Sequence, residues 1–302
     1  MRNLLTTSSL VSLIAVFILT SCTTNPRSDR SDSMIQAQDR ETADLADVVT
    51  DTLELSETAG RENILVVLDI DNTLLAMEQG LGADQWYEWQ KNISENDHCN
   101  PHNVGNRFAV QGALYFASAM RPTQEDAATQ VGILQDNGIR VIALTSRGFD
   151  YRLQTFRELR RNGYSFSHSA IGPSGGFDAA FMPVENGRLS LYEDGVFLTA
   201  GQHKGEMLQA LLQKTNTRMP TVIIVADDNQ KNLDAIKETF NAMNIPVHAW
   251  RYTGEDENVA TFDPEQAHSQ WKSIEAALRQ VQKVLGPDNY DLSSAVPVQC
   301  KP

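Results

Sequence analysis

Continuous apolar runs alternate along the chain with segments whose apolar residues recur at helical spacing. The runs Ile64–Leu68, Val141–Leu144 and Val222–Val225 predict strands that are buried on both faces. Two further segments, Ser165–Ile171 and Val247–Arg251, predict strands of the same sheet. Strands that read as unbroken apolar runs are typical of a parallel sheet with helices on both faces.

The segments between these runs predict helices, because their apolar residues recur every three or four positions. Gly138 and Gly163 stand where two of these helices should end. The predicted helices extend over Met34 to about Leu55, about Thr123 to Asn137, Tyr151 to Asn162, Gly205 to Lys214 and Pro264 to Leu285, with one more around Leu233, Ile236 and Phe240. From the third of these helices we expect Leu153, Phe156 and Leu159 to face the core.

Strands that alternate with helices of this length predict an α/β fold, a Rossmann-like parallel sheet with helices on both faces. The segment Phe181–Thr199 has short β-like runs separated by Gly187 and Gly195, so it predicts a hairpin inserted into the pattern. Ligands of such folds bind at the carboxyl ends of the strands. Functional side chains are therefore expected where the strands end.

Pairs of carboxylates follow two of the predicted strands. Asp69 and Asp71 come directly after the first buried strand, and Asp227 and Asp228 follow the run that begins at Val222. Buried carboxylates are costly without a compensating charge, and their oxygens are ligands suited to Mg²⁺. The pattern therefore predicts a magnesium site at this edge of the sheet.

Other polar residues stand at comparable positions. The strand that begins at Val141 ends in Thr145-Ser146-Arg147, and Asn232 follows the second pair of aspartates. Lys204 directly precedes a predicted helix, where its ammonium and the helix N-terminal amides can meet an anion together. Each feature alone is common in caps and on surfaces, and it is their joint order along the chain that indicates function.

The N-terminus predicts export. Met1–Ser21 contains Arg2 and an apolar stretch from Leu10 to Leu19 that is too short to span a membrane, as in a signal peptide. The residues up to Cys22 resemble the lipobox of bacterial lipoproteins, in which this cysteine is acylated; an ordinary signal peptide with a chance cysteine is the alternative. Thr23 stands where Asp would favour the inner membrane, so we expect an outer-membrane lipoprotein that faces the periplasm.

The remainder of the chain divides into a tether and one domain. Residues 22–33 are polar and are expected to link the lipid to a domain that covers residues 34–302. Two cysteines, Cys99 and Cys300, either pair in the oxidising periplasm or stay as free thiols. The sequence does not choose between these alternatives.

The order of the motifs resembles that of the haloacid-dehalogenase-like (HAD) superfamily, over about residues 64–251. The matching residues are Asp69 and Asp71 in its first motif, Thr145 in the second, Lys204 in the third, and Asp227, Asp228 and Asn232 in the fourth. The chain is also similar to the class C acid phosphatases and, more closely, to an uncharacterised group of secreted bacterial lipoproteins. It has Asn72 where class C enzymes carry Glu, so no substrate is carried over from that class.

The resemblance implies a phosphohydrolase with an aspartate nucleophile. Asp69 would attack phosphorus to form an aspartyl-phosphate. Asp71 would protonate the leaving oxygen and then activate the water that hydrolyses this intermediate. Thr145 and Lys204 would hold the phosphoryl oxygens.

The resemblance also implies the composition of the metal site. Mg²⁺ would be bound by Asp69, by the main-chain carbonyl of Asp71 and by Asp228. Asp227 would complete the acidic group around the metal. Together with Asn232 it would orient water molecules or Lys204.

In the superfamily an insertion after the first strand forms a cap over the site, and here it extends from about residue 74 to 120. Within it, Trp86 and Trp89 either stack on a substrate ring or attach the cap to the core. Ser146 and Arg147 are candidates for binding the substrate, although Arg147 could instead pair with a surface acid.

Charge limits the choice of substrate. The formal net charge is −14 and the chain has no basic run, which disfavours a nucleic-acid polymer as partner. A small phosphorylated substrate is compatible with this charge because a bound metal reverses the local sign. Together with the motifs, the resemblance implies a magnesium-dependent phosphomonoester hydrolase of undetermined oligomeric state. The alternatives are a phosphotransferase of the same fold and a catalytically idle binding lipoprotein.

Overall fold

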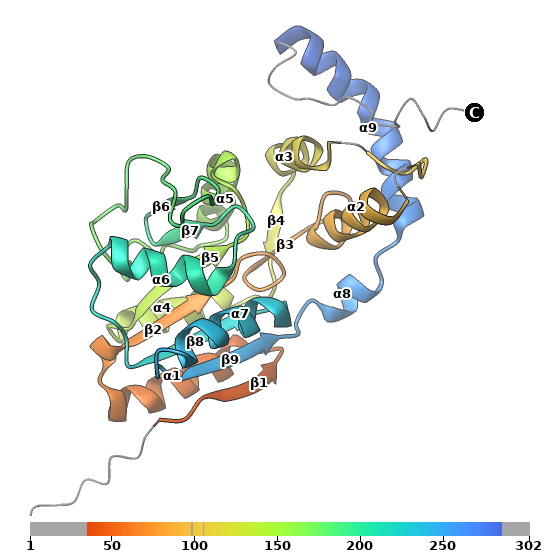
Figure 1. Ribbon diagram of the computed structural model, residues 1–302. Coiled ribbons are helices and arrows are strands. Elements are labelled where there is room, and N and C mark those ends of the chain that lie inside the picture. The colour runs from red at the N-terminus through yellow and green to blue at the C-terminus, as the bar shows by residue number, and fades with distance from the viewer. Residues whose placement is uncertain (1–34, 98, 105, 286–302) are drawn as a thin grey trace, which may run out of the picture. The chain divides into compact units, whose positions relative to one another are not determined.

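A seven-stranded sheet forms the centre of the computed structural model, which describes residues 35–97, 99–104 and 106–285 (Figure 1). The strand order is β1-β9-β8-β2-β5-β7-β6. The strands are β1 Gln38–Thr42, β2 Ile64–Leu68, β5 Arg140–Thr145, β6 Leu191–Glu193, β7 Val196–Leu198, β8 Val222–Asp227 and β9 Val247–Tyr252. Neighbouring strands are parallel, except that β6 runs antiparallel to β7. The predicted α/β fold is confirmed.

Helices cover both faces of this sheet. One face carries α1 (Leu45–Ala59), α4 (Ala127–Asp136) and α5 (Arg152–Arg161), and the other carries α6 (Lys204–Lys214) and α7 (Gln230–Asn241). Successive residues of β2 pack alternately against the two layers, and all five are buried. Because both faces are covered, β2 has the unbroken apolar sequence that predicted it.

A small insertion follows the first of the predicted strands, as expected. Its short strands β3 (Leu75–Met77) and β4 (Met120–Pro122) pair antiparallel, and they form a stalk that leads to and from α2 (Asp84–Asn96) and α3 (Arg107–Ala117). The C-terminal helix α9 (Pro264–Leu285) packs against these helices rather than against the sheet (Figure 1). The cap thus has two parts, which come from distant regions of the chain.

The core of the cap explains this arrangement. Trp86, Val110 and Leu114 of the insertion are buried together with Ala267 and Trp271 of α9. Two helices of this length bury little apolar surface by themselves, and α9 supplies the missing partner. The prediction of a helix over Pro264 to Leu285 is confirmed, with the same bounds.

Three details of the sequence prediction are wrong. Gln38–Thr42 belong to an edge strand rather than to the predicted N-terminal helix, which begins only at Leu45 after its cap Asp44. The residues of β1 are mostly exposed and pair through the backbone, so they carry no apolar pattern that would identify a strand. The side chain of Leu153 is 69% exposed instead of facing the core.

The third error concerns Ser165–Ile171, which form turns rather than a strand. The position beside β5 is taken by β7, which forms a hairpin with β6. The hairpin within Phe181–Thr199 is therefore confirmed, but it extends the main sheet rather than standing apart from it. The apolar residues Phe166 and Ile171 suggested a buried strand, but they are buried as parts of a loop.

Several predictions concern residues that the structure does not describe. The signal peptide, Cys22 and the tether all lie outside the described residues. Cys99 is disulfide-bonded. Cys300 lies outside the described residues, so its pairing with Cys99 stays a prediction.

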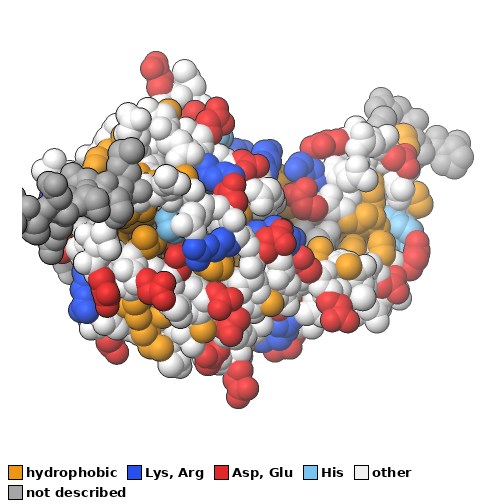
Figure 2. Space-filling view, turned by 90° about the horizontal axis from the view of Figure 1, so that it is seen from below, with side chains coloured by type: hydrophobic (Ala, Val, Ile, Leu, Met, Phe, Trp, Pro, Cys, Tyr) orange, Lys and Arg blue, Asp and Glu red, His pale blue; other side chains and the backbone are white. Residues whose placement is uncertain are grey.

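Of the helices within the described ranges, none is both long and apolar enough to cross a membrane. Acidic side chains are spread over the face shown in Figure 2, in keeping with the net charge of −14.

Candidate functional site

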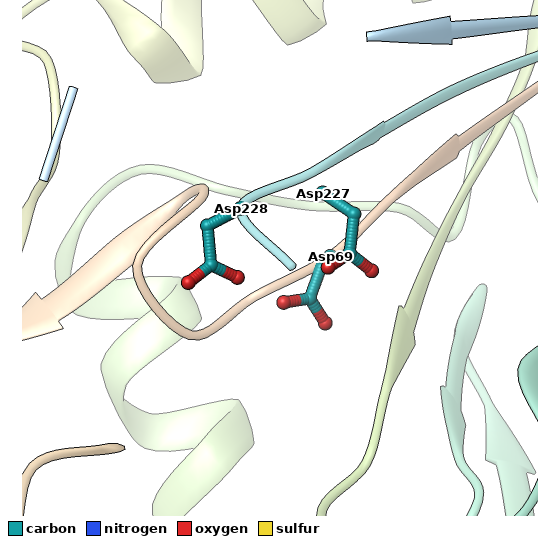
Figure 3. Close-up of side chains that lie close together, drawn as sticks. All are labelled: Asp69, Asp227 and Asp228. Atoms are coloured by element: carbon teal, nitrogen blue, oxygen red, sulfur yellow. The ribbon is translucent and has the colours of Figure 1, made fainter. Parts of the chain in front are cut away.

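Three carboxylates converge at the carboxyl edge of the sheet. Asp69 directly follows β2, and Asp227 and Asp228 stand at the end of the adjacent β8 (Figure 3). Each contributes an oxygen, and these oxygens all lie within 4.8 Å of one another. The backbone fixes this approach, since the Asp69 amide donates to the carbonyl of Ala226 at 2.9 Å. Asp69 thus meets Asp227 and Asp228 as expected, whereas the carboxylate of Asp71 is not part of this group.

Lys204 lies between two of these carboxylates. Its Nζ is 2.6 Å from Asp69 Oδ1 and 2.6 Å from Asp227 Oδ2, and the residue is only 2% exposed. Burial opposes the charge, but Asp227 and Asp69 together raise the pKa of Lys204 above its ordinary value. The ammonium is therefore a fixed positive charge at the first turn of α6.

One ammonium does not balance three carboxylates. Burial, and then the charge of Asp227, raise the pKa of Asp69 well above its ordinary value. Burial, followed by the charges of Asp69 and Asp227, raises the pKa of Asp228 to about 9. Burial and the mutual repulsion of the carboxylates thus favour their protonated forms as long as Lys204 is the neighbouring cation. A divalent cation would supply further positive charge, and three carboxylate groups are a donor set suited to Mg²⁺.

The two residues of the second pair differ in their surroundings. Asp227 Oδ1 accepts hydrogen bonds from the Asn232 side chain at 3.0 Å and the Asn229 amide at 2.9 Å. The carboxylate of Asp228 accepts none from the residues that the structure describes. Its main-chain amide donates to Thr73 Oγ1 at 3.0 Å, which ties the end of β8 to the turn after β2. Asp227 is thus held by protein groups, whereas Asp228 keeps its oxygens for a ligand.

Asp71 lies beside this cluster and is bound by Arg147. The guanidinium donates to Asp71 from Nε at 2.9 Å and from Nη2 at 2.7 Å, and Nη1 donates to Thr155 Oγ1 at 2.9 Å. The cation also lies 4.6 Å from the ring centroid of Tyr115. Of the two alternatives for Arg147, the structure shows a pairing with an acid, the partly buried Asp71, and contact with substrate stays a prediction. It orients Asp71.

The other residues predicted for substrate binding are placed differently. Thr145 ends β5, and its buried hydroxyl accepts the Arg147 amide at 3.1 Å and keeps its own proton for a ligand. Ser146 follows at an exposed position. Trp86 has no exposed surface and lies in the core of the cap. The prediction that Trp86 stacks on a substrate is therefore wrong, and the ring attaches parts of the cap to each other.

A fifth acidic residue, Asp84, escaped the sequence analysis. It is the first residue of α2, and burial, followed by the charge of Asp71, raises its pKa to about 7. Two hydrogen-bonded residues of α3 link the start of α2 to Asp71. Gln111 donates to the carbonyl of Gly82, just before α2, and to the hydroxyl of Tyr115. This hydroxyl lies 3.4 Å from Asp71 Oδ1. The sequence shows Asp84 only as one acidic residue within the insertion. Its place near Asp71 results from the folding of the cap.

Residues 41–283 match the family described as "Protein of unknown function (DUF2608)", and the chain belongs to this family. The match extends from the end of β1 to α9 and includes every residue of the site. None of the curated proteins matches the chain. The family description names no activity, so a function has to be argued from the geometry of the site.

Proposed function

We propose that the protein is a magnesium-dependent phosphomonoester hydrolase that acts through an aspartyl-phosphate on Asp69. One observation supports this above all. Asp69 is bound by Lys204 inside a cluster of three carboxyl groups and one ammonium, and Asp71 lies next to it. A nucleophilic carboxylate, a fixed ammonium and ligands for a cation are the groups that phosphoryl transfer requires.

The nucleophile and the phosphoryl group have assigned partners in this arrangement. Lys204 bonds Oδ1 of Asp69, which leaves Oδ2 to attack phosphorus. An ammonium has three donors, and only two are used by Asp69 and Asp227, so the third can bind a phosphoryl oxygen. The hydroxyl of Thr145 supplies a second donor. Mg²⁺ held by Asp69, Asp228 and the main-chain carbonyl of Asp71 would add positive charge where the phosphoryl oxygens develop negative charge.

Asp71 is the group that exchanges protons. Its two oxygens are held by the two nitrogens of Arg147, so the carboxyl plane is fixed relative to Asp69. Oδ1 also accepts the hydroxyl of Tyr115, whereas Oδ2 retains a lone pair for a proton from the leaving group or from water. Fixed orientation is what general acid–base catalysis requires, because proton transfer demands hydrogen-bond distance in the transition state.

We further propose where the enzyme works and on what. An acylated Cys22 would hold it at the outer membrane, on the periplasmic side, as the N-terminal sequence indicates. Small phosphorylated substrates fit the net negative chain better than nucleic-acid polymers do, since like charge repels polyanions at a distance.

Turnover of simple esters tests this function. Full-length protein in detergent should release phosphate from p-nitrophenyl phosphate, AMP and glycerol phosphate with Mg²⁺, and release should stop with chelator and return with added Mg²⁺. Phosphate release in the presence of excess alcohol separates hydrolysis from the alternative phosphotransfer. Absence of release from all three esters, or full activity in chelator, would rule the proposal out.

A further inference from the structure

A polar cavity of about 160 Å³ lies beside the proposed active site. Its walls come from the turn after β2, from the β3–β4 stalk with the start of α2, and from the segment that joins α8 (Asp256–Ala260) to α9. None of the five residues assigned above to nucleophile, proton exchange, phosphoryl binding or metal lines it. The cavity is thus separate from the proposed active site, and one of its lining residues, Asn72, directly follows Asp71 in the chain.

Two carboxamides of this cavity lack partners among the described residues. Asn72 is 5% exposed, and its side chain makes no hydrogen bond within the part of the chain that the structure describes. Oε1 of Gln85 is buried and also has no partner there. Leaving a buried polar atom such as Gln85 Oε1 unpaired costs about 1–3 kcal/mol, so a ligand group would gain a hydrogen bond there. The amide of Asn72 offers a second position for such a bond.

The remaining walls define the chemistry of that ligand. Phe262 provides an apolar surface, against which a Cβ at Gly80 would lie only 3.3 Å away. Two of the charged lining residues neutralise each other, because Arg121 donates to Glu255 at 2.7 and 2.8 Å. Glu78 and Asp263 also line the cavity, and neither forms an ion pair with a described residue. The surplus is acidic, so an anion is disfavoured.

We propose that this cavity binds a neutral, hydroxyl-rich ligand of the size of a monosaccharide. A hydroxyl both donates and accepts, and therefore satisfies carboxamides and carboxylates alike. The carbon face of a sugar ring packs on an aromatic ring such as Phe262. The bound sugar would join the turn that carries Asp71 to the stalk and to the α8–α9 segment. This inference does not depend on the phosphatase activity.

Calorimetric titration of the full-length protein tests the inference, in a polyoxyethylene detergent that has no sugar headgroup. The probes are D-glucose, N-acetyl-D-glucosamine and D-glucuronate. At least one neutral sugar should bind saturably, and glucuronate should bind about tenfold more weakly because it adds a carboxylate near Glu78 and Asp263. Gln85→Leu should lower the affinity about tenfold, since it keeps the bulk but removes the amide.

Matched variants keep the outcome clear. Gln270→Leu alters an exposed cavity residue of α9 and should also weaken binding, whereas Gln213→Leu on the exposed side of α6 should not. Thermal unfolding verifies that each variant is folded. The proposal is overturned if neither neutral sugar binds saturably, if glucuronate binds as tightly as glucose, or if Gln85→Leu and Gln270→Leu bind like the unchanged protein.

Discussion

Two buried clusters of charged side chains differ in how their charges are matched. At the carboxyl edge of the sheet, Lys204 faces three aspartates, and the pKa values of Asp69 and Asp228 are raised. Near the start of β9, Asp51 is paired with His248 at 2.9 Å and with Arg40 at 3.1 Å. Burial opposes the charge there too, but the hydrogen bond and charge of His248 lower the pKa of Asp51.

The difference shows how a functional cluster can be told from a structural one. Each oxygen of Asp51 has a cationic or N–H partner within the protein, so this cluster is complete and stabilises the contact of α1 with β9. The cluster at Asp69 is complete only with an added cation. The places of the two clusters in the sheet agree with this distinction. In the strand register, His248 lies opposite Ile224 in the interior of β8, whereas Asp227 is the last residue of that strand, at the edge where ligands bind.

The largest expected difference between the clusters is in turnover. Asp69→Asn should abolish phosphate release, and Asp71→Asn should reduce it by about two to four orders of magnitude, the usual contribution of general acid–base catalysis. Asp51→Asn, measured per folded molecule, should keep normal turnover because it lies away from the edge where the site is formed. Steady-state kinetics with p-nitrophenyl phosphate measure all three. Near-normal turnover of folded Asp69→Asn would contradict the assignment.

Stability should respond next, in the balanced cluster. Asp51→Asn should lower the free energy of unfolding by about 1–3 kcal/mol, because His248 and Arg40 lose a charged acceptor in a buried setting. Chemical denaturation monitored by circular dichroism gives the value. Asp39→Asn, whose carboxylate forms an exposed pair with Lys237, is the control and should change it little. Equal effects of both substitutions would mean that the Asp51 cluster is not structural.

A smaller change of opposite sign is expected in the unbalanced cluster. In metal-free protein, Asp228→Asn should raise the free energy of unfolding by about 1 kcal/mol, because an amide is neutral without taking up the proton that folded Asp228 needs to stay uncharged. With Mg²⁺ the sign should reverse, since the variant has lost a ligand. The same denaturation experiment, with chelator and with Mg²⁺, checks both signs. Destabilisation of the metal-free variant would show that Asp228 is already balanced by protein groups.

The two clusters should also differ in how stability depends on pH. The folded pKa of Asp228 is about 9 and its ordinary value is 3.8, so the native state holds a proton that the unfolded chain has lost between these values. Stability of the metal-free protein should therefore fall as pH rises from about 5 to 8. Asp51 acts in the other direction: its pKa is lowered, so its contribution is present above 3.8 and is lost in acid.

Thermal unfolding across this pH range separates the two contributions. Asp228→Asn should flatten the decline above neutral pH, and Asp51→Asn should flatten the loss of stability in acid. Added Mg²⁺ should also reduce the decline above neutral pH. If the unchanged metal-free protein gains stability as pH rises from about 5 to 8, the carboxylate cluster does not lack positive charge.

The sequence predicted that Asp69, Asp227 and Asp228 lie at one edge of the sheet, because local features were sufficient to place them at strand ends. Buried strands are recognisable from their apolar runs, and a parallel sheet brings the carboxyl ends of its strands to one edge. The same logic failed for β1, which is polar and is held through backbone pairing with β9. An edge strand of this kind has no side-chain pattern to be read.

The residues around the motifs were out of reach for a different reason. The pairing of Arg147 with Asp71 joins positions 76 residues apart, and the burial of Trp86 depends on Trp271 of α9. Asp84 reaches the site only because α3 and the turn after β2 hold the start of α2. These contacts follow from how the cap packs, and neither spacing nor periodicity encodes them.

Metal binding tests the central claim most directly. Calorimetric titration of metal-free, full-length protein with Mg²⁺ at neutral pH should show one saturable site per chain. Asp228→Asn should abolish or strongly weaken that site, whereas Asp51→Asn should retain it, since only the first removes a carboxylate from the unbalanced cluster. Absence of saturable Mg²⁺ binding, or equal binding by the unchanged protein and Asp228→Asn, would contradict the account.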